Sequence, residues 1–175
     1  DARIGLEPAK TGLPVHIGFN RAFKSMLADI KQFIRQHEKN VKTFHCIGHS
    51  LGGAVATLMA DWLKTYKAGA VKVYTFGAPK VGLLMFNANF TRKLGKENIF
   101  RAFHPTDPVA MIPLFPYVHS PLPGYGHYIT SQENTISVAA HSVDLYAKSV
   151  STATWAGLER KAPIYAIEDL PLIHI

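Results

Sequence analysis

The chain has 175 residues, 47% of them hydrophobic and 18% charged, which predicts one folded domain over residues 1–175 and excludes an intrinsically disordered chain. Its net charge of +7 comes from lysines dispersed along the sequence, without a basic segment interleaved with aromatic residues, so we expect no nucleic-acid partner. The single cysteine, Cys46, excludes a disulfide within the chain, and no apolar run approaches the roughly 20 residues that a membrane span needs.

Helical and strand-like patterns alternate from the start of the chain. Residues 20–39 carry apolar side chains at intervals of three and four, which predicts an amphipathic helix with Asn20 as its N-cap. Residues 43–47 form a short apolar run typical of a buried strand. Residues 54–67 return to helical spacing, so a second helix should follow this strand closely.

The same alternation continues in the second half. Residues 71–76 and 99–103 predict two strands with a helix over 83–94 between them, which indicates an α/β fold with a mostly parallel sheet and helices on both faces. Residues 104–127 contain six prolines and predict a long functional loop. We then expect short strands at 128–129 and 135–138 and a helix over 141–150, whereas no role is apparent for residues 164–167.

Residues 48–53 read Gly-His-Ser-Leu-Gly-Gly and lie between the predicted strand 43–47 and the predicted helix 54–67. A Gly-x-Ser-x-Gly pattern in this position is typical of a nucleophile elbow, here residues 48–52, in which a strained strand-to-helix turn exposes the serine hydroxyl. Glycines on either side let the strand and the helix pass close together. We therefore predict Ser50 as a catalytic nucleophile, the alternative being a glycine-rich turn with a capping serine.

A serine hydroxyl needs a base within hydrogen-bond reach and an acid that orients this base. In hydrolases with this elbow the acid follows the serine in the chain, at the end of a later strand. Asp107 meets both conditions, because it comes four residues after Phe103 at the end of the strand 99–103. Asp61 lies inside the helix 54–67, too close to the serine in sequence to fold back onto it.

The base is less well defined, because the chain has nine histidines. His49 adjoins Ser50 but points away from it on such a turn, which favours a packing or pocket-lining role. The residues alone do not choose among the three downstream candidates, His119, His127 and His141. No histidine pair has metal-ligand spacing with a nearby cysteine or carboxylate cluster, so we predict neither a metal nor an organic cofactor.

Five blocks in order resemble the class 3 lipases, the fungal-type triacylglycerol lipase family of α/β hydrolases. Residues 15–19 resemble the family's Val-His-x-Gly-Phe segment, residues 48–53 its elbow, and residues 75–82 its Thr-Phe-Gly-x-Pro-Arg-x-Gly signature. Asp107-Pro-Val, followed by Ile-Pro, is similar to the acid loop. Tyr-Val-His at 117–119 and Gly-His-Tyr-Ile at 126–129 resemble the family's non-catalytic His-x-Gly and Glu-Tyr-Trp stretch.

The resemblance implies roles that the residues alone leave open. It places the base at His141, in a helix start similar to the family's His-x-x-x-Tyr, with His119 as the runner-up. The backbone N–H of Leu51, directly after the nucleophile, would supply one oxyanion donor. The family's Phe-Arg-Gly-Ser/Thr strand and lid have no counterpart in residues 1–14. We therefore expect a C-terminal portion of a longer protein, the alternative being a minimal variant with a substitute oxyanion donor. The family's strand order would leave strand 43–47 at an exposed sheet edge.

These observations predict an α/β-hydrolase-fold serine esterase that cleaves lipid esters, as a triacylglycerol lipase or phospholipase, through an acyl-enzyme intermediate. The enzymatic alternative is a small-ester or feruloyl esterase, because the elbow does not encode acyl length. The non-enzymatic alternative is an inactive hydrolase-like fragment that binds lipid or a partner. We expect a lipid or small-ester substrate and transient contact with a lipid interface. The chain starts without a secretory hydrophobic segment, which leaves the compartment open.

Overall fold

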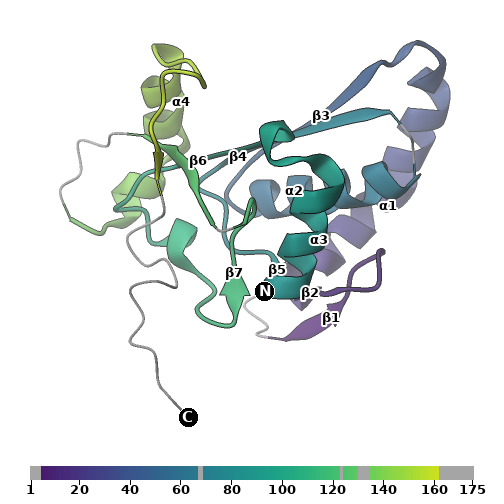
Figure 1. The fold of residues 1–175 in the computed structure, drawn as a ribbon, viewed down its shortest axis with the longest axis horizontal. Coiled ribbons are helices and arrows are strands. Elements are labelled where there is room, and N and C mark those ends of the chain that lie inside the picture. Colours follow the sequence, from purple (N-terminus) through teal and green to yellow (C-terminus); the bar gives the residue numbers. More distant parts are fainter. Residues whose placement is uncertain (1–4, 67–68, 123, 130–134, 162–175) are drawn as a thin grey trace.

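The computed structural model describes residues 5–66, 69–122, 124–129 and 135–161. A sheet lies at its centre, with β3, β4 and β6 side by side (Figure 1). The spatial order of its five strands is β3 (Thr43–His49), β4 (Ala70–Phe76), β6 (Ile99–Phe103), β8 (Gly126–Tyr128) and β9 (Arg160–Lys161). All pairs are parallel except β8 with β9. The predicted strands 43–47, 71–76 and 99–103 are therefore confirmed as neighbours in a mostly parallel sheet.

Three helices cover one face of this sheet. They are α1 (Ile17–His37), α2 (Leu51–Tyr66) and α3 (Leu84–Leu94). The central one, α2, packs against β3 and β4, and the other two pack against α2. The apolar positions that predicted α2 are buried here, because Leu58 and Leu63 join Cys46 and Val73 of the strands in the main core. Helical spacing thus placed the buried side of α2 correctly.

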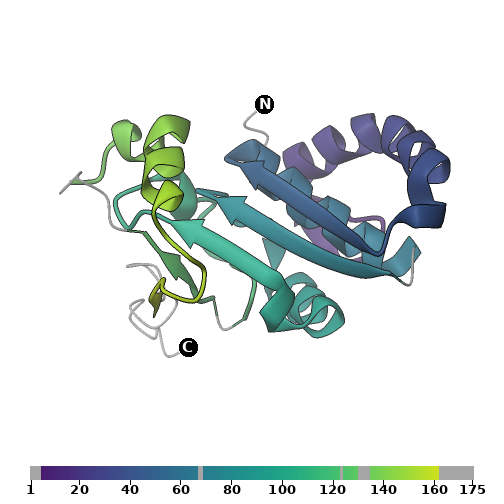
Figure 2. The same cartoon turned by 90° about the horizontal axis from the view of Figure 1, so that it is seen from above.

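The other face carries a smaller core under α4 (Val143–Ser151) and residues 153–158. Side chains alternate between the faces of a strand, so Tyr74 and Phe76 point to this side and pack against Trp155. Tyr146 of α4 is buried against Ala102 in the same cluster. Figure 2 shows α4 near the carboxyl ends of the strands. Both faces of the sheet are therefore covered by helices, as the sequence pattern predicted.

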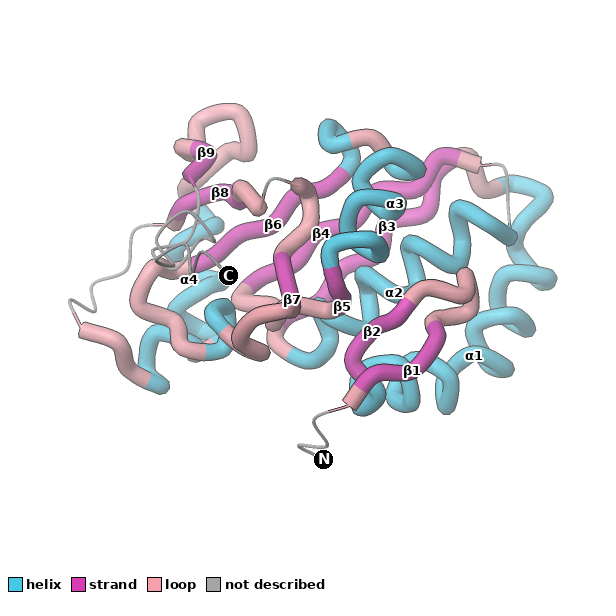
Figure 3. The backbone as a smooth tube through the Cα atoms, turned by 60° about the horizontal axis from the view of Figure 1, so that its bottom comes forward, coloured by secondary structure: helices cyan, strands magenta, loops and turns pink. Residues whose placement is uncertain are grey.

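A second, small antiparallel sheet was not predicted from the sequence (Figure 3). Its strands, in spatial order, are β1 (Leu6–Pro8), β2 (Pro14–His16), β5 (Gly82–Leu83) and β7 (Tyr117–Val118). Each strand has only two or three residues, too few for a hydrophobic period to show. This sheet joins the start of the described chain to the segment after β6, because β5 pairs with both β2 and β7.

The predicted N-cap of the first helix is wrong. The helix begins at Ile17, and the Nδ1 atom of His16 accepts the Gly18 N–H at 3.2 Å. Asn20 is fully buried inside the helix, where its amide donates to Glu7 Oε1 at 2.6 Å and to the Pro8 carbonyl at 2.9 Å. Asparagine favours helix starts when its side chain is free to cap, but here this side chain is used to hold β1.

Further differences concern the second half. The strand expected at 135–138 is absent, because residues 135–137 are irregular and Val138 begins a 3-10 turn, Val138–His141. Its apolar side chains are exposed, so no sheet buries this alternating pattern. The loop 104–127 holds a 3-10 turn, Val109–Met111, besides β7 and the start of β8. Two further 3-10 turns follow α1 and α3, at Glu38–Asn40 and Lys96–Asn98. Residues 164–167 lie outside the described part of the chain.

Strand β3 lies at one edge of the large sheet as the structure describes it. Its only partner there is β4, and the side chain of Ile47 is 66% exposed. An open strand edge of this kind is a template for pairing with another chain. The expected edge position of the nucleophile strand is thus confirmed for the described residues. Within these same residues no helix is long and apolar enough to cross a bilayer.

Candidate active site

The elbow predicted at residues 48–52 is present between β3 and α2. Ser50 has a φ of +57°, the only positive value at a non-glycine residue in the described ranges. A Cβ on Gly48 would lie 2.2 Å from the Gly52 carbonyl oxygen, and one on Gly53 would lie 2.6 Å from the Cβ of Ala78. Only glycine fits these two positions, whereas a Cβ on Gly52, the second glycine of the Gly-x-Ser-x-Gly pattern, would meet no atom within 4 Å.

The three residues that sequence reasoning selected meet at this turn. The Ser50 hydroxyl lies 2.7 Å from Nε2 of His141, and Nδ1 of His141 lies 2.9 Å from Oδ2 of Asp107. They come from three separate places: the end of β3, the 3-10 turn before α4, and the segment after β6. The serine hydroxyl donates to Nε2 when Nδ1–H donates to the carboxylate, which is the tautomer a general base requires.

The carboxylate of Asp107 is fully buried and well supplied with donors. Besides His141, its oxygens accept the Val109 N–H at 2.8 Å and the Tyr146 hydroxyl at 2.8 Å. The Tyr146 oxygen in turn accepts the backbone N–H of His104 at 2.9 Å. Burial and the Asp107 charge raise the pKa of Tyr146, so the phenol remains a donor at every ordinary pH. These bonds fix the orientation of the carboxyl group beside His141.

His49 supports the ring of His141 from the other side. Its Nε2–H donates to the His141 carbonyl at 2.9 Å, and the two imidazole centroids are 4.6 Å apart in a stacked arrangement. Burial, then the His141 charge, lowers the pKa of His49, which keeps its ring neutral near pH 7. The packing and pocket-lining role expected for His49 is confirmed, because it also lines an apolar hollow with Phe76 and Tyr146.

The two other downstream histidines lie elsewhere. His119 is buried, and its Nε2–H donates to the Ala110 carbonyl at 2.6 Å. His127 belongs to β8 and packs against the rings of Phe100 and Trp155. No hydrogen bond joins either ring to Ser50 in the described ranges. Among these three histidines the fold brings only His141 to the serine.

The helix α2 begins directly after the serine. Leu51 is the first residue of this helix, and the first N–H groups of a helix have no partner within it. The side chain of Leu51 is half exposed, and exposed apolar side chains also flank His141 in sequence, at Val138 and Val143.

Within the residues that the structure describes, no group of three or more His, Cys, Asp or Glu side chains could hold a metal ion.

Sequence reasoning missed the supporting role of Tyr146. The residue stands in the stretch that resembles the family's helix start, but a tyrosine five positions after a histidine carries no geometric signal of its own. Its contact with Asp107 depends on how α4 docks on the sheet. Such a contact follows from tertiary packing and not from spacing.

Comparison with known proteins finds that the chain is similar to lipases. The sequence model of the lipase (class 3) family matches residues 2–117. A secreted mono- and diacylglycerol lipase 1 from Fusarium solani is 41% identical over 115 residues, which is 62% of this chain and 33% of that protein. Secreted mono- and diacylglycerol lipase A from Penicillium cyclopium is 34% identical over 135 residues, 73% of this chain and 42% of that protein.

Solved structures agree on the fold. A crystal structure of a mutant form of MDLA from Penicillium cyclopium has a TM-score of 0.68 at 27% identity. The match covers 95% of this chain and 56% of the other. The chain thus spans about a third to two fifths of the length of the curated relatives that it matches.

Proposed function

Because this chain belongs to the class 3 lipase family and has its α/β-hydrolase fold, we propose that it hydrolyses carboxylic esters of lipids with Ser50 as the nucleophile. The observation that carries this proposal is the hydrogen-bonded row from Ser50 through His141 to Asp107, with spacings of 2.7 and 2.9 Å. The row begins at a serine held at φ +57° on an elbow. Such a row is the geometry of an activated serine.

In the proposed first step the Ser50 oxygen forms a bond to the ester carbonyl carbon while Nε2 of His141 takes the hydroxyl proton. Asp107 stabilises the imidazolium that results, and its two other donors keep it in place. The carbonyl oxygen becomes an oxyanion, which the Leu51 N–H at the start of α2 stabilises. Collapse of this intermediate breaks the ester bond, and the imidazolium returns its proton to the departing alcohol.

The second step releases the acid. A water molecule gives a proton to Nε2 of His141 and attacks the acyl-enzyme, and collapse of the new intermediate restores the Ser50 hydroxyl. His49 and Tyr146 take no proton in this scheme; they hold the base and the acid.

The substrate class follows from the relatives and from the surface near the elbow. Both curated relatives described above are mono- and diacylglycerol lipases. Exposed apolar side chains at Leu51, Val138 and Val143 adjoin the triad residues in sequence and suit contact with a lipid surface. We therefore propose partial acylglycerols as substrates, ahead of triacylglycerols, phospholipids and feruloyl or other small esters.

A fluorophosphonate probe and a set of esters test the proposal. The probe should label Ser50, and Ser50→Ala should lose both labelling and hydrolysis, by at least about a thousandfold in kcat. Mono- and diacylglycerols should turn over faster than a triacylglycerol, a phosphatidylcholine or a feruloyl ester of matched concentration. A folded chain that the probe does not label would establish the non-enzymatic alternative. A labelled chain that prefers feruloyl esters would overturn only the substrate class.

A further inference from the structure

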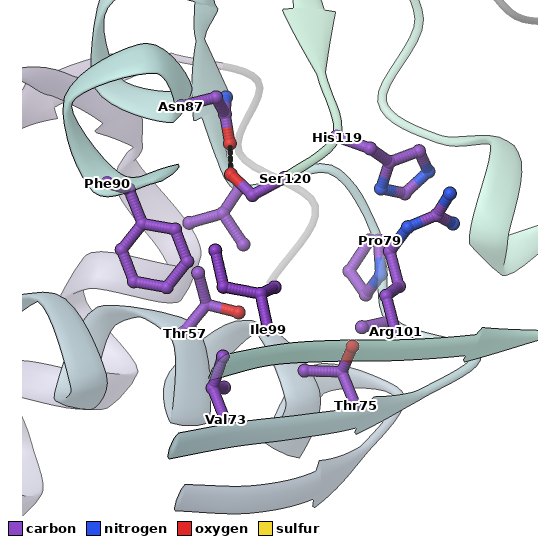
Figure 4. A pocket seen from close by; sticks show the side chains of 12 residues that line it. Thr57, Val73, Thr75, Pro79, Asn87, Phe90, Ile99, Arg101, His119 and Ser120 are labelled. Carbon is purple, nitrogen blue, oxygen red and sulfur yellow. Dashed lines mark hydrogen bonds between the residues drawn. The ribbon is translucent and has the colours of Figure 1, made fainter. Parts of the chain in front are cut away.

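A second cluster of buried polar side chains lies apart from the triad, between β4, β6, α2, α3 and residues 119–120 (Figure 4). It surrounds a cavity of about 20 Å³. The polar side chains that line this cavity are Thr57, Thr75, Asn87, Arg101, His119 and Ser120. None of the lining residues described by the structure is acidic. The volume suits a single occupant of about the size of one water molecule.

Arg101 is the charged group of this cluster, and its hydrogen bonding is incomplete. The residue is only 3% exposed, and its Nε and Nη1 atoms have no hydrogen-bond partner among the described residues. Nη2 alone is engaged there, donating to the Gly124 carbonyl at 2.6 Å. Burial lowers the pKa of Arg101 to about 9, so the guanidinium remains charged at neutral pH. A buried charge without a counter-charge is costly.

The ring of Phe103 contacts the guanidinium of Arg101, with its centroid 4.7 Å from Cζ, but the cationic groups nearby add positive charge. Lys80 is buried nearby, and burial followed by the Arg101 charge lowers its pKa. Burial and then the Arg101 charge hold the pKa of His119 well below its ordinary value, and Lys80 contributes to this shift. His119 is therefore neutral, with Nε2–H donating to the Ala110 carbonyl. Arg101 is therefore the one cation among the lining residues, Lys80 is a second buried cation near it, and no lining residue is a carboxylate.

The adjacent strand β8 supplies no carboxylate either. A Cβ on Gly126 would lie 2.6 Å from Cζ of Arg101, so the guanidinium packs directly on the backbone of this strand. Residues 126–129 read Gly-His-Tyr-Ile, whereas the family stretch that they resemble contains a glutamate. On the side of β8 the guanidinium is thus covered by backbone, and its cavity side is the one left open to an occupant.

We propose that this cavity binds a small monovalent anion, of which chloride is the probe, against the free Nε–H and Nη1–H of Arg101. Water would satisfy these donors but would leave the positive charge uncompensated, whereas a halide does both. Larger organic anions do not fit a cavity of this volume. The site is independent of ester hydrolysis, because none of the triad residues lines it.

The first test measures the melting temperature while chloride replaces gluconate at constant ionic strength. A ligand that binds only the folded state raises Tm with concentration, and each kcal/mol corresponds to about 2–4 °C for a chain of this size. We expect a saturable rise of about 3 °C or more. Arg101→Met keeps the length of the side chain and removes its charge, so this variant should lose the dependence. Arg92→Met, at an exposed position, is the matched control and should keep it.

Gluconate also acts on the whole surface, so the measure is the difference between the two variants. An equal chloride dependence in Arg101→Met and Arg92→Met would overturn the proposal, as would a Tm that ignores chloride in the unaltered chain. If Arg101→Met does not fold, crystals of the unaltered chain in bromide decide. An anomalous peak in contact with the guanidinium supports the anion, and water or a side-chain carboxylate there overturns it.

Discussion

Asp107 and Arg101 are both buried and both charged, yet their surroundings differ completely. Asp107 has three donors, from His141, Tyr146 and the Val109 backbone. Arg101 has a single acceptor within the described residues, the Gly124 carbonyl, and two nitrogen atoms without a partner. The segment after β6 serves both, because it carries Asp107 to the triad and His119 to the cavity. Burial alone therefore does not reveal what a charged group does. Asp107 is held by hydrogen bonds, whereas Arg101 keeps two nitrogen atoms that the described residues leave without a partner.

The largest expected effect is the loss of kcat in a variant of His141, compared with a variant of His119. His141→Ala should lower kcat by at least about a thousandfold, nearly as much as Ser50→Ala, because the two side chains act as a unit. The double variant should be no worse than either single variant. Fluorophosphonate labelling and ester turnover measure this directly.

His119→Ala is the matched comparison. It should cost about 1–3 kcal/mol of stability, since the Ala110 carbonyl loses its donor. Its kcat should stay within about tenfold of the original at a temperature where the chain is folded. If His119→Ala proved inactive while His141→Ala retained turnover, the assignment of the base would be wrong.

Tyr146→Phe removes one hydrogen-bond partner of Asp107, so that this side chain, like Arg101, has fewer partners. The variant removes one donor from the carboxylate and leaves the His104 N–H without its acceptor, which should cost about 1–3 kcal/mol of stability. If part of this loss also raises the activation free energy of the reaction, kcat falls by about tenfold for each 1.4 kcal/mol. Chemical denaturation and kcat measured side by side separate the two contributions. An unchanged kcat would mean that the remaining donors hold Asp107 by themselves.

Acid should destabilise the unaltered chain more than a variant that lacks His119, the buried histidine of the cavity. Burial and neighbouring cations hold the pKa of His119 well below 6.5, so the unfolded chain takes up the proton more readily than the folded one. The contribution of this group to the free energy of unfolding is therefore fully present above about pH 6.5. It is lost as the pH falls, by up to about 1.4 kcal/mol per pH unit. His119→Gln keeps an amide donor that does not titrate. In chloride-free buffer its stability should fall less steeply between pH 6.5 and 5; equal slopes would contradict the prediction.

The smallest expected effect concerns self-association of the chain through the edge of β3. The edge of β3 is open in the described sheet, and Ile47 is exposed on it. Association through this edge would blur any comparison of single sites. Ile47→Lys places a charge on the edge strand and should shift the sedimentation profile toward the monomer. Val138→Lys, at an exposed position outside the strand, should shift it less.

The sequence predicted the parts of the molecule that local rules govern. Residues 48–53 can fold in few ways, since Gly48 and Gly53 have no room for a side chain. The helical stripe of α2 and the apolar run of β6 show their periods directly. The position of Asp107 after β6 follows from the topology of a parallel sheet, whereas the residues alone left three histidines open, and only the resemblance pointed to His141.

Tertiary contacts account for the rest. Asn20 fails as a cap because its amide is bound to Glu7 and Pro8, residues that helix propensity does not consider. The contacts of Tyr146 and His49 with the triad require α4 to be docked. The cavity beside Arg101 is formed by five separate segments, and no spacing within one of them indicates it. The single-domain prediction for residues 1–175 stays a prediction.

The backbone of Ser50 has a consequence for how variants of this protein would be selected. A residue at φ +57° carries a conformational penalty that glycine does not. We expect Ser50→Gly to melt at a higher temperature than the original chain while losing its nucleophile. Thermal stability thus favours glycine at position 50, whereas turnover requires serine there. A library screened for survival on heating alone would enrich inactive chains there, and only a screen that also demands ester cleavage would retain the serine.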